Sequence, residues 1–428
     1  MSEILYEITE AFIGSIKNKA FQDYVQSFLD DDRYFLESIS RYGLPLEHPL
    51  PYAPGNDSGI ITRNNGHSLY LNRISPACIA CRGEAESATH FISMRCTRKC
   101  YYCFNTGNEN YEYYLTHKRD YRKEFQLYRE AGFSPAYIGL TGGEPLIHKE
   151  DAVAFFRLAK ELFPGVHTRL YTCGDPLDAE LLTALKAAGL DEIRVSVKLE
   201  DSAAAQAETL EKLALAKDYI PAVMVEMPVI PGSLEEMKDL LLKLDAIGIF
   251  GINLLEFCFP LTPSEEFNGF KIKNPPYQVL YHYGYGGGLP VAGSEEGCLA
   301  LLDFAAERKM SIGVHYCSLE NKFTGQIWAQ NKAYSSRFTL RSEKDFFIKT
   351  AKVFGADIPK VQKRLKQGEC LLLDDALLFH PDLIPTLRSE RIEIGISLNV
   401  VEKEEGEEYL RELKILYTTP EQFDPCDL

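Results

Sequence analysis

Three cysteines lie close together in the sequence, at Cys96, Cys100 and Cys103. They follow an apolar stretch that predicts a strand over residues 90–94. Three thiolates cannot all pair in disulfides, because one is always left over. They can instead hold one face of an iron–sulfur cube, since such clusters take soft sulfur ligands. A cube with three protein ligands keeps one iron open to an outside ligand. The alternatives for these cysteines are a zinc site or three ordinary thiols.

The run CTRKCYYC resembles the signature of the radical S-adenosylmethionine (SAM) superfamily, with Tyr102 at the aromatic position before the last cysteine. Its members include enzymes like the pyruvate formate-lyase activating enzyme. The resemblance implies a [4Fe–4S] cluster on Cys96, Cys100 and Cys103, whose open iron binds the amino and carboxylate groups of SAM. It also implies that an electron from the cluster cleaves SAM to methionine and a 5′-deoxyadenosyl radical. A one-electron donor of the flavodoxin or ferredoxin type would supply that electron.

A second element of this resemblance stands one helix and one strand later. Residues 136–140 (AYIGL) predict a buried strand that runs into TGGEP at residues 141–145. Two glycines let the backbone approach a ligand closely, and the Glu144 carboxylate can accept hydrogen bonds from an ammonium group. The run is similar to the GGEP motif of the superfamily, which implies that Gly142, Gly143 and Glu144 hold the amino group of SAM.

Three further predicted strand ends offer candidate SAM contacts. In barrels of parallel strands, ligands gather at the carboxyl ends of the strands. We therefore expect Thr172, Ser196 and Lys198 at this edge, and Lys198 could bind the SAM carboxylate. The segment VIPG, residues 229–232, resembles the stretch that lies along the adenine in this superfamily, which adds Ile230 as a candidate.

Cys78 and Cys81 form a CxxC pair that ends fifteen residues before Cys96. Such a pair can bind one metal ion or form a redox disulfide. Cys317 stands at the end of a later predicted strand, residues 312–316, and could complete a site. We predict a possible auxiliary centre on these three cysteines, either a second iron–sulfur cluster or a single zinc or iron. The alternative is a pair of loop thiols.

From residue 90 the chain alternates predicted strands and helices, which is the pattern of parallel βα units. Six such units match the partial barrel of the radical SAM superfamily. The expected fold class is therefore α/β, a partial (β/α)6 barrel with a helical extension before it and a small α+β unit after it. The six predicted strands are residues 90–94, 136–141, 168–173, 192–198, 222–229 and 251–257.

The sequence order predicts four consecutive parts. Apolar residues recur at helical spacing over residues 21–28, and prolines crowd residues 45–54. The parts are a helical extension and linker (1–75), the barrel core with the preceding CxxC pair (76–257), a barrel extension that lines the substrate cavity (258–340) and the α+β unit (341–428). For the last part we predict a helix near residues 343–354 and a hairpin of strands 392–400 and 409–417.

The 428 residues carry a net charge of −16, which argues against a broad nucleic-acid or anionic-membrane surface. No run of eighteen apolar residues is present, and the acidic amino terminus lacks the basic region of a signal peptide. Eleven cysteines, several at metal-type spacing, fit a reducing compartment better than a disulfide scaffold. We therefore expect a cytoplasmic protein without a membrane or nucleic-acid partner.

These features predict a radical SAM enzyme that abstracts hydrogen from a peptide or small-molecule substrate. The fold itself does not determine the substrate. The short spacing within the core and the VIPG segment resemble those of activases. Activation of a glycyl-radical enzyme, which would be a partner protein, is therefore an alternative. A second alternative is a non-catalytic iron–sulfur or zinc protein, which would neither bind nor cleave SAM.

Overall fold

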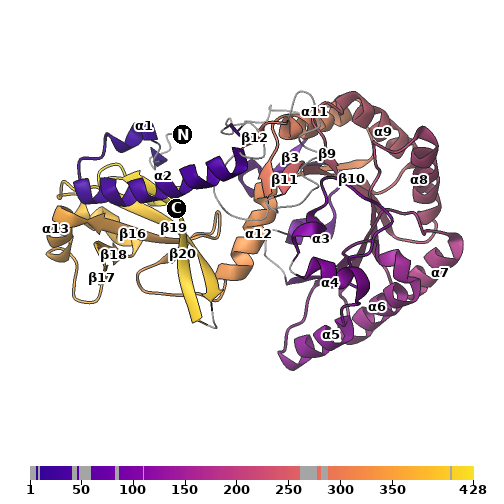
Figure 1. Cartoon of the computed structure of the whole chain (residues 1–428), viewed down its shortest axis with the longest axis horizontal. Coiled ribbons are helices and arrows are strands. Elements are labelled where there is room, and N and C mark those ends of the chain that lie inside the picture. The colour runs from indigo at the N-terminus through magenta and orange to yellow at the C-terminus, as the bar shows by residue number, and fades with distance from the viewer. Residues whose placement is uncertain are drawn as a thin grey trace. The chain divides into compact units, whose positions relative to one another are not determined.

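The computed structural model describes residues 6–7, 10–40, 46–47, 59–81, 86–108, 110–260, 277–280, 288–404 and 407–428. Its contacts divide the chain into two compact units (Figure 1). The barrel unit comprises residues 44–282 and 287–322, and the terminal unit comprises residues 1–43, 283–286 and 323–428.

The terminal unit combines segments from both ends of the chain, whereas the four parts expected from the sequence follow one another in order. The division at residues 75, 257 and 340 stays a prediction. Part of the predicted barrel extension, residues 261–276 and 281–287, lies outside the described residues.

The barrel unit is built on an open nine-stranded sheet, in the order β3-β4-β14-β10-β9-β8-β7-β6-β5. The strands from β5 to β10 correspond to the six predicted parallel strands, which confirms the partial barrel. The first of them, β5, ends at Phe91 and shares only residues 90–91 with the predicted strand 90–94. Strand β14 adds a seventh parallel strand beside β10, and β4 and β3 continue the sheet antiparallel. The bounds are β3 (Ile61–Arg63), β4 (Ser68–Leu71), β5 (Ser87–Phe91), β6 (Tyr137–Thr141), β7 (His167–Thr172), β8 (Glu192–Val195), β9 (Ala222–Val229), β10 (Gly251–Glu256) and β14 (Gly313–Cys317).

Helices cover the outer face of this sheet (Figure 1). Their apolar faces and the outward side chains of the strands form one core that includes Phe155, Leu182, Leu213, Leu241 and Leu302, each exposed by 1% or less. Side-chain caps begin several of the helices: Asp178, the cap of α7, accepts from the Leu181 amide at 2.7 Å. The bounds are α4 (Tyr111–Thr116), α5 (Tyr121–Glu130), α6 (Lys149–Leu162), α7 (Ala179–Ala187), α8 (Ala203–Ala216), α9 (Leu234–Ile247) and α11 (Ser294–Glu307).

The inner side of the same sheet carries the short helix α3 (Pro76–Ala80), which contains Cys78 (Figure 1). Ser75 begins α3 and accepts from the Ala77 amide at 3.2 Å. The other short strands of the barrel unit are β2 (Leu46–Glu47), β11 (Cys258–Pro260), β12 (Val279–Leu280) and β13 (Gly288–Pro290). Helix α12 (Leu319–Asn331) contains the boundary between the two units.

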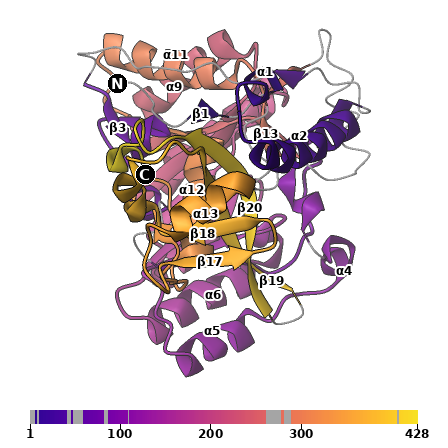
Figure 2. The ribbon, with the colours of Figure 1, turned by 90° about the vertical axis from the view of Figure 1, so that its left-hand side faces the viewer.

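The terminal unit is a sheet in the order β1-β20-β19-β16-β18-β17, with β15 beside β16. The long hairpin β19–β20, drawn in yellow in Figure 2, confirms the predicted hairpin. The bounds are β1 (Tyr6–Glu7), β15 (Leu340–Arg341), β16 (Ile348–Phe354), β17 (Cys370–Leu373), β18 (Ala376–Phe379), β19 (Ile394–Glu404), β20 (Glu407–Thr418), α1 (Glu10–Ile13), α2 (Lys19–Ser40), α13 (Ile358–Gln362) and the 3-10 helices η4 (Gly355–Asp357) and η5 (Pro381–Leu387).

Helix α2 confirms the predicted helical extension and packs on this sheet. Phe21 and Val25 lie in one cluster with Phe354 and Ile415, whereas α13 and η5 add side chains to a second cluster. The helix predicted near residues 343–354 is wrong, because β16 occupies residues 348–354. All seven of its residues are buried, so this central strand lacks the alternation that would have marked it as a strand.

No helix in the described part of the chain combines enough length and apolar character to cross a membrane.

The packing of α2 gives a testable prediction. Phe21 is fully buried and stacks on Phe354 with ring centroids 4.8 Å apart. We expect Phe21→Ala to lower the free energy of unfolding of the terminal unit by about 3–5 kcal/mol. Trp328, the single tryptophan of the chain, lies in this unit, so its fluorescence in a urea titration reports the effect. Asp23→Ala, which removes an exposed ion pair, is the control, and equal midpoints for the two variants would contradict the packing of α2.

Candidate active site

The cysteine loop, residues 92–103, leaves the carboxyl end of β5 and carries the predicted cluster ligands. Cys96 is exposed, Cys100 and Cys103 are half-buried, and all three are free thiols. Burial raises the pKa of Cys96, although a hydrogen bond from the Arg98 amide to its sulfur, at 3.4 Å, opposes the rise. The loop therefore holds three reduced thiols within one short, solvent-reached segment.

Among the residues that the structure describes, no three His, Cys, Asp or Glu side chains converge closely enough to form a ready metal site. The metal-ligand roles of Cys96, Cys100 and Cys103 therefore stay predictions.

The glycine segment after β6 continues the pairing of β5 and β6 beyond the sheet. The Gly143 amide donates to the Ser93 carbonyl at 3.1 Å, and the Glu144 amide donates to the Arg95 carbonyl at 2.7 Å. Gly142 has φ +110°, and a Cβ there would lie 2.8 Å from the Ser93 carbonyl oxygen. A Cβ at Gly143 would lie 1.9 Å from the Arg95 carbonyl oxygen. Only glycine fits both positions, so the two predicted motifs meet backbone to backbone.

Glu144 is 1% exposed, and its carboxylate joins the ends of two strands. One oxygen accepts from the Leu146 amide at 2.9 Å and from the Thr172 hydroxyl at 2.8 Å, and the other accepts from the Cys173 amide at 2.7 Å. A carboxylate can accept about four hydrogen bonds. Three protein donors therefore fix Glu144 and leave room for about one more donor.

Thr172 and Cys173, at the end of β7, both donate hydrogen bonds to the Glu144 carboxylate. The Thr172 hydroxyl donates to Glu144 and accepts from the Gly174 amide at 3.0 Å, so it positions the carboxylate. Burial, reinforced by the Glu144 charge, raises the pKa of the Cys173 thiol. The predicted contact between Thr172 and SAM stays a prediction.

Lys198 and Ser196 stand just beyond the end of β8, next to the cysteine loop. The Lys198 ammonium lies 3.4 Å from the Tyr102 hydroxyl and 5.2 Å from the centre of its ring. Burial raises the pKa of Tyr102, which keeps its hydroxyl neutral. The Ser196 amide donates to the Thr172 carbonyl and its hydroxyl donates to the Glu226 carbonyl, both at 3.0 Å.

Aromatic rings pack around Tyr102 in the cysteine loop. Tyr102 packs edge-on against Tyr101 and Phe257, with ring centroids 4.9 and 5.6 Å apart. Ile230, directly after β9, is half-buried, and its carbonyl accepts from the Ser233 amide at 3.1 Å and the Ser233 hydroxyl at 2.7 Å. Its expected contact with an adenine stays a prediction.

Sequence reasoning missed the charged clamp that holds the cysteine loop to the segments that follow β7 and β8. The Arg98 guanidinium donates to both oxygens of Asp175, at 2.6 and 2.9 Å, and to both oxygens of Asp201, at 2.7 and 2.8 Å. Thr97 adds a 2.7 Å hydrogen bond to Asp175. Burial would raise the pKa of Asp175, but the bonds from Arg98 and Thr97 lower it. The signal available in the sequence was the position of Arg98, a cation between the candidate cluster ligands Cys96 and Cys100.

The inner face of the sheet is closed by a buried ionic network under helix α3. Arg194 on β8 donates to Ser75 at 3.1 Å and to the Cys78 sulfur at 3.3 Å, and it pairs with Glu192 and Glu226 at 2.5 Å each. Burial alone would raise the pKa of Glu192, but Arg194 and its other donors lower it to about 2. Because every one of these buried charges has a partner, α3 is held firmly against the sheet.

The three thiols of the predicted auxiliary centre are electrostatic neighbours inside this unit. Burial raises the pKa of Cys78 to about 11 and that of Cys317 to about 12. The charges of Cys81 and Cys78 raise the pKa of Cys317 further, whereas Lys322 lowers it. Cys78 and Cys317 therefore stay neutral thiols at neutral pH, and the auxiliary centre stays a prediction.

Comparison with known proteins gives these features a family context. Residues 91–244 match the family model described as the radical SAM superfamily. The chain is 26% identical, over 331 residues, to a protein of Methanocaldococcus jannaschii that is named, provisionally, a glycyl-radical enzyme activating enzyme. That alignment covers 73% of this chain and 84% of the relative.

Solved structures give weaker likenesses. The crystal structure of Streptococcus suis SuiB bound to its precursor peptide SuiA has 15% identity and a TM-score of 0.41, and the match covers 60% of this chain and 54% of that one. The structure of anSMEcpe with bound AdoMet and the Cp18Cys peptide has 16% identity and a TM-score of 0.33, covering 42% and 53%. The chain thus spans about half the length of these structures.

The clamp predicts that Arg98 keeps the cysteine loop ordered. We expect Arg98→Gln to raise the hydrogen-exchange rate of the amides in residues 96–103 about tenfold, because a charge-assisted network of this kind contributes roughly 1.5–3 kcal/mol. Hydrogen-exchange mass spectrometry measures this, with Arg129→Gln on the exposed side of α5 as the matched control. Unchanged exchange in the loop would show that the clamp does not order it.

Glu144 offers a second test. Glutamine has the same shape but presents an amide NH₂ in place of one carboxylate oxygen, so one of the three donors would face another donor. We expect Glu144→Gln to destabilise the barrel unit by about 1–3 kcal/mol, measured by thermal unfolding. Glu161→Gln on the exposed side of α6 should have almost no effect. Equal melting temperatures for both variants would argue against the buried bonds of Glu144.

Proposed function

We propose that residues 91–244, which match the radical SAM family model, bind a [4Fe–4S] cluster through Cys96, Cys100 and Cys103 and hold SAM beside it. The proposed reaction is reductive cleavage of SAM followed by hydrogen abstraction from a substrate. Proteins of this superfamily use both cofactors, so the domain match implies them.

One observation carries this proposal: the glycine segment and the cysteine loop are joined through their backbones. The Gly143 and Glu144 amides bond to the carbonyls of Ser93 and Arg95, directly before the first cysteine. The two segments that the reaction needs thus lie at the carboxyl edge of one parallel sheet. A structural cysteine site would not need glycines that no side chain can replace.

The residues present fit the two cofactors. Three reduced thiols share one short loop, which suits a cluster with one open iron. When bound, the cluster supplies an electron and SAM supplies the carbon radical that takes hydrogen from the substrate. Glu144 has capacity for about one more donor, which an ammonium group could use. Lys198 is the cation at the same edge that could pair with a carboxylate.

The other residues around this edge would orient and shield the reaction. Thr172 holds Glu144 in place, and Arg98 holds the loop between Cys96 and Cys100. Helix α3 covers the inner face of the sheet, which would keep water away from a reactive radical. Ser196 and Ile230 complete the proposed SAM contacts at the ends of β8 and β9.

A second candidate narrows the substrate to a protein. The named relative from Methanocaldococcus jannaschii matches most of both chains, so we propose activation of a glycyl-radical enzyme as the most specific form of this function. A peptide or a small molecule is the broader alternative. We further propose a one-electron donor of the flavodoxin or ferredoxin type, a cytoplasmic location, and a possible second metal centre at Cys78, Cys81 and Cys317.

The test is anaerobic reconstitution with iron and sulfide, reduction with excess SAM, and quantification of 5′-deoxyadenosine. We expect the wild type to form 5′-deoxyadenosine. A Cys96/Cys100/Cys103→Ala variant should form roughly 100-fold less or none, because all three proposed cluster ligands are removed. Iron per chain is measured in parallel.

Controls separate the two proposed centres. A Cys370/Cys426→Ala variant alters two cysteines of the terminal unit and should retain full activity. A Cys78/Cys81→Ala variant should lose iron only if the second centre exists. A reconstituted wild type that holds iron and sulfide but yields no 5′-deoxyadenosine would favour the non-catalytic alternative.

A further inference from the structure

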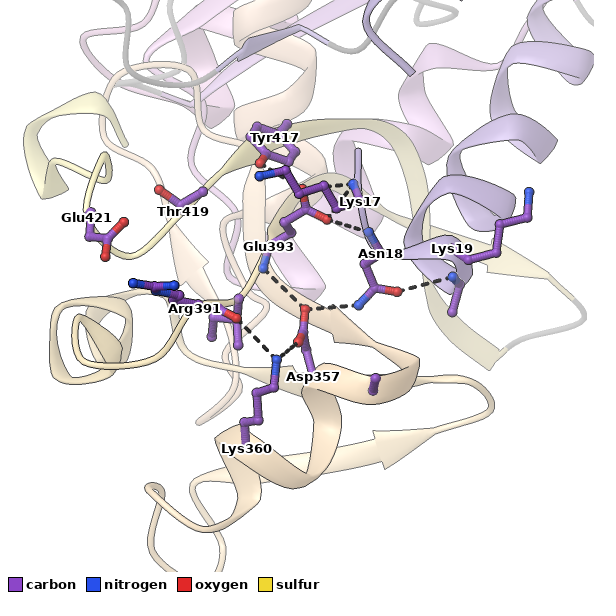
Figure 3. Close-up of a pocket in the computed structure, with 13 residues that line it drawn as sticks. Lys17, Asn18, Lys19, Asp357, Lys360, Arg391, Glu393, Tyr417, Thr419 and Glu421 are labelled. Atoms are coloured by element: carbon purple, nitrogen blue, oxygen red, sulfur yellow. Dashed lines mark hydrogen bonds and ion pairs between the residues drawn. The ribbon is translucent and has the colours of Figure 1, made fainter. Parts of the chain in front are cut away.

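A cavity lies wholly within the terminal unit. It has a volume of about 700 Å³, within the range of small-molecule sites. Its walls are the start of α2, η4 with the following α13, the residues before β19 and the end of β20. Figure 3 shows Arg391, Thr419 and Glu421 on one side and Lys17, Asn18 and Glu393 on the other.

The two buried acids of this cavity, Glu393 and Asp357, are held by several hydrogen bonds from the protein. Glu393, 9% exposed, accepts from the Lys17 amide at 3.0 Å, from the Asn18 amide at 2.7 Å and from the Tyr417 hydroxyl at 3.0 Å. Both oxygens of Glu393 thus accept hydrogen bonds from the residues directly before α2, whose own first amides, those of Ala20 and Phe21, donate to the Asn18 side chain.

Asp357 is fixed in the same way. It is 5% exposed and accepts from the Lys360 ammonium at 2.6 Å, the Asn18 side-chain amide at 2.9 Å and the Glu393 amide at 3.3 Å. Lys360 also donates to the Arg391 carbonyl at 3.2 Å. These contacts build a rigid back wall from segments that lie more than 330 residues apart in the chain.

The side chains left over are mostly cationic. Within the described part of the chain, the Lys17 ammonium, the Arg391 guanidinium and the Glu421 carboxylate have neither a hydrogen bond nor an ion pair. Lys19 pairs instead with Asp23 at 2.7 Å. Over the whole lining, four ionisable side chains are cationic and three are anionic. The excess is one positive charge, which favours binding of an anionic group that carries a single negative charge.

We propose that this cavity binds a carboxylate, with Arg391 and Lys17 as its partners. A guanidinium donates two parallel hydrogen bonds to a carboxylate, and an ammonium adds a third. The negative charges of Glu421, Glu393 and Asp357 disfavour a doubly charged phosphate. The carboxylate could belong to the carboxyl terminus of a polypeptide or to a free amino acid. The terminal unit would then recognise a ligand independently of the radical chemistry.

Isothermal titration calorimetry on the full chain, without cluster or SAM, tests this proposal. The probes are N-acetyl-triglycine, its carboxyl-terminal amide, glycine and inorganic phosphate. We expect N-acetyl-triglycine or glycine to bind, and the amide to bind at least tenfold more weakly than the free acid. A preference for N-acetyl-triglycine identifies a polypeptide terminus as the source, and a preference for glycine identifies a free amino acid.

Variants tie the binding to the cavity. Arg391→Gln and Lys17→Gln should each weaken carboxylate binding about tenfold, because each removes a charge-assisted bond. Arg388→Gln, an exposed arginine three residues away outside the cavity, is the matched control and should bind as the wild type does. Glu421→Gln should bind equally or more tightly.

Three results would overturn the proposal: no carboxylate binding at millimolar concentration, tighter binding of phosphate than of either acid, or unchanged binding in both Arg391→Gln and Lys17→Gln. Thermal unfolding of each variant confirms that it is folded. Since the assay uses no cluster, its outcome is independent of 5′-deoxyadenosine formation.

Discussion

The arrangement of the candidate site depends on one close approach of two backbones, where Gly142 and Gly143 pass against Ser93 and Arg95. A side chain at Gly143 would overlap the Arg95 carbonyl oxygen at 1.9 Å, so the contact exists only because that residue has no Cβ. The approach extends the β5–β6 pairing beyond the sheet and brings the cysteine loop to the residue that precedes Glu144. The hydrogen bonds of the Glu144 carboxylate and the ion pairs of Arg98 are made by residues on either side of this contact.

Buried charges then determine how rigid the site is. Glu144 receives three donors, and Arg98 donates to two aspartates at neighbouring strand ends. A buried or half-buried charge without a partner costs several kcal/mol, so these groups hold their neighbours in one arrangement even where they add little net stability. The same reasoning applies to Arg194 and Glu192 beneath helix α3. Preorganisation of this kind is what a site needs if it is to hold ligands without rearrangement.

The sequence was sufficient for the parallel strands and for the cysteine and glycine segments, because hydrophobic runs and glycine pairs are local signals. It was not sufficient for β16, which is buried on both faces and therefore shows no alternation. It also could not show that Thr172 bonds to Glu144, or that Arg98 reaches Asp175, since such pairs depend on which strand ends become neighbours. Hydrophobic periodicity can predict that a strand is present, but it cannot predict which residues far apart in the sequence contact each other.

The terminal unit extends the same principle across the length of the chain. Glu393 binds the amides of Lys17 and Asn18, 376 and 375 residues earlier, at the start of helix α2. These two residues lie directly before α2, whose first amides donate to the Asn18 side chain. A carboxylate at this end of a helix also interacts favourably with the helix dipole. Helix α2 therefore cannot reach its final environment until the last strands have been synthesised. The barrel unit, whose sheet is built from residues 61–317, does not wait for them, so we infer that its fold forms first and the two ends of the chain join afterwards.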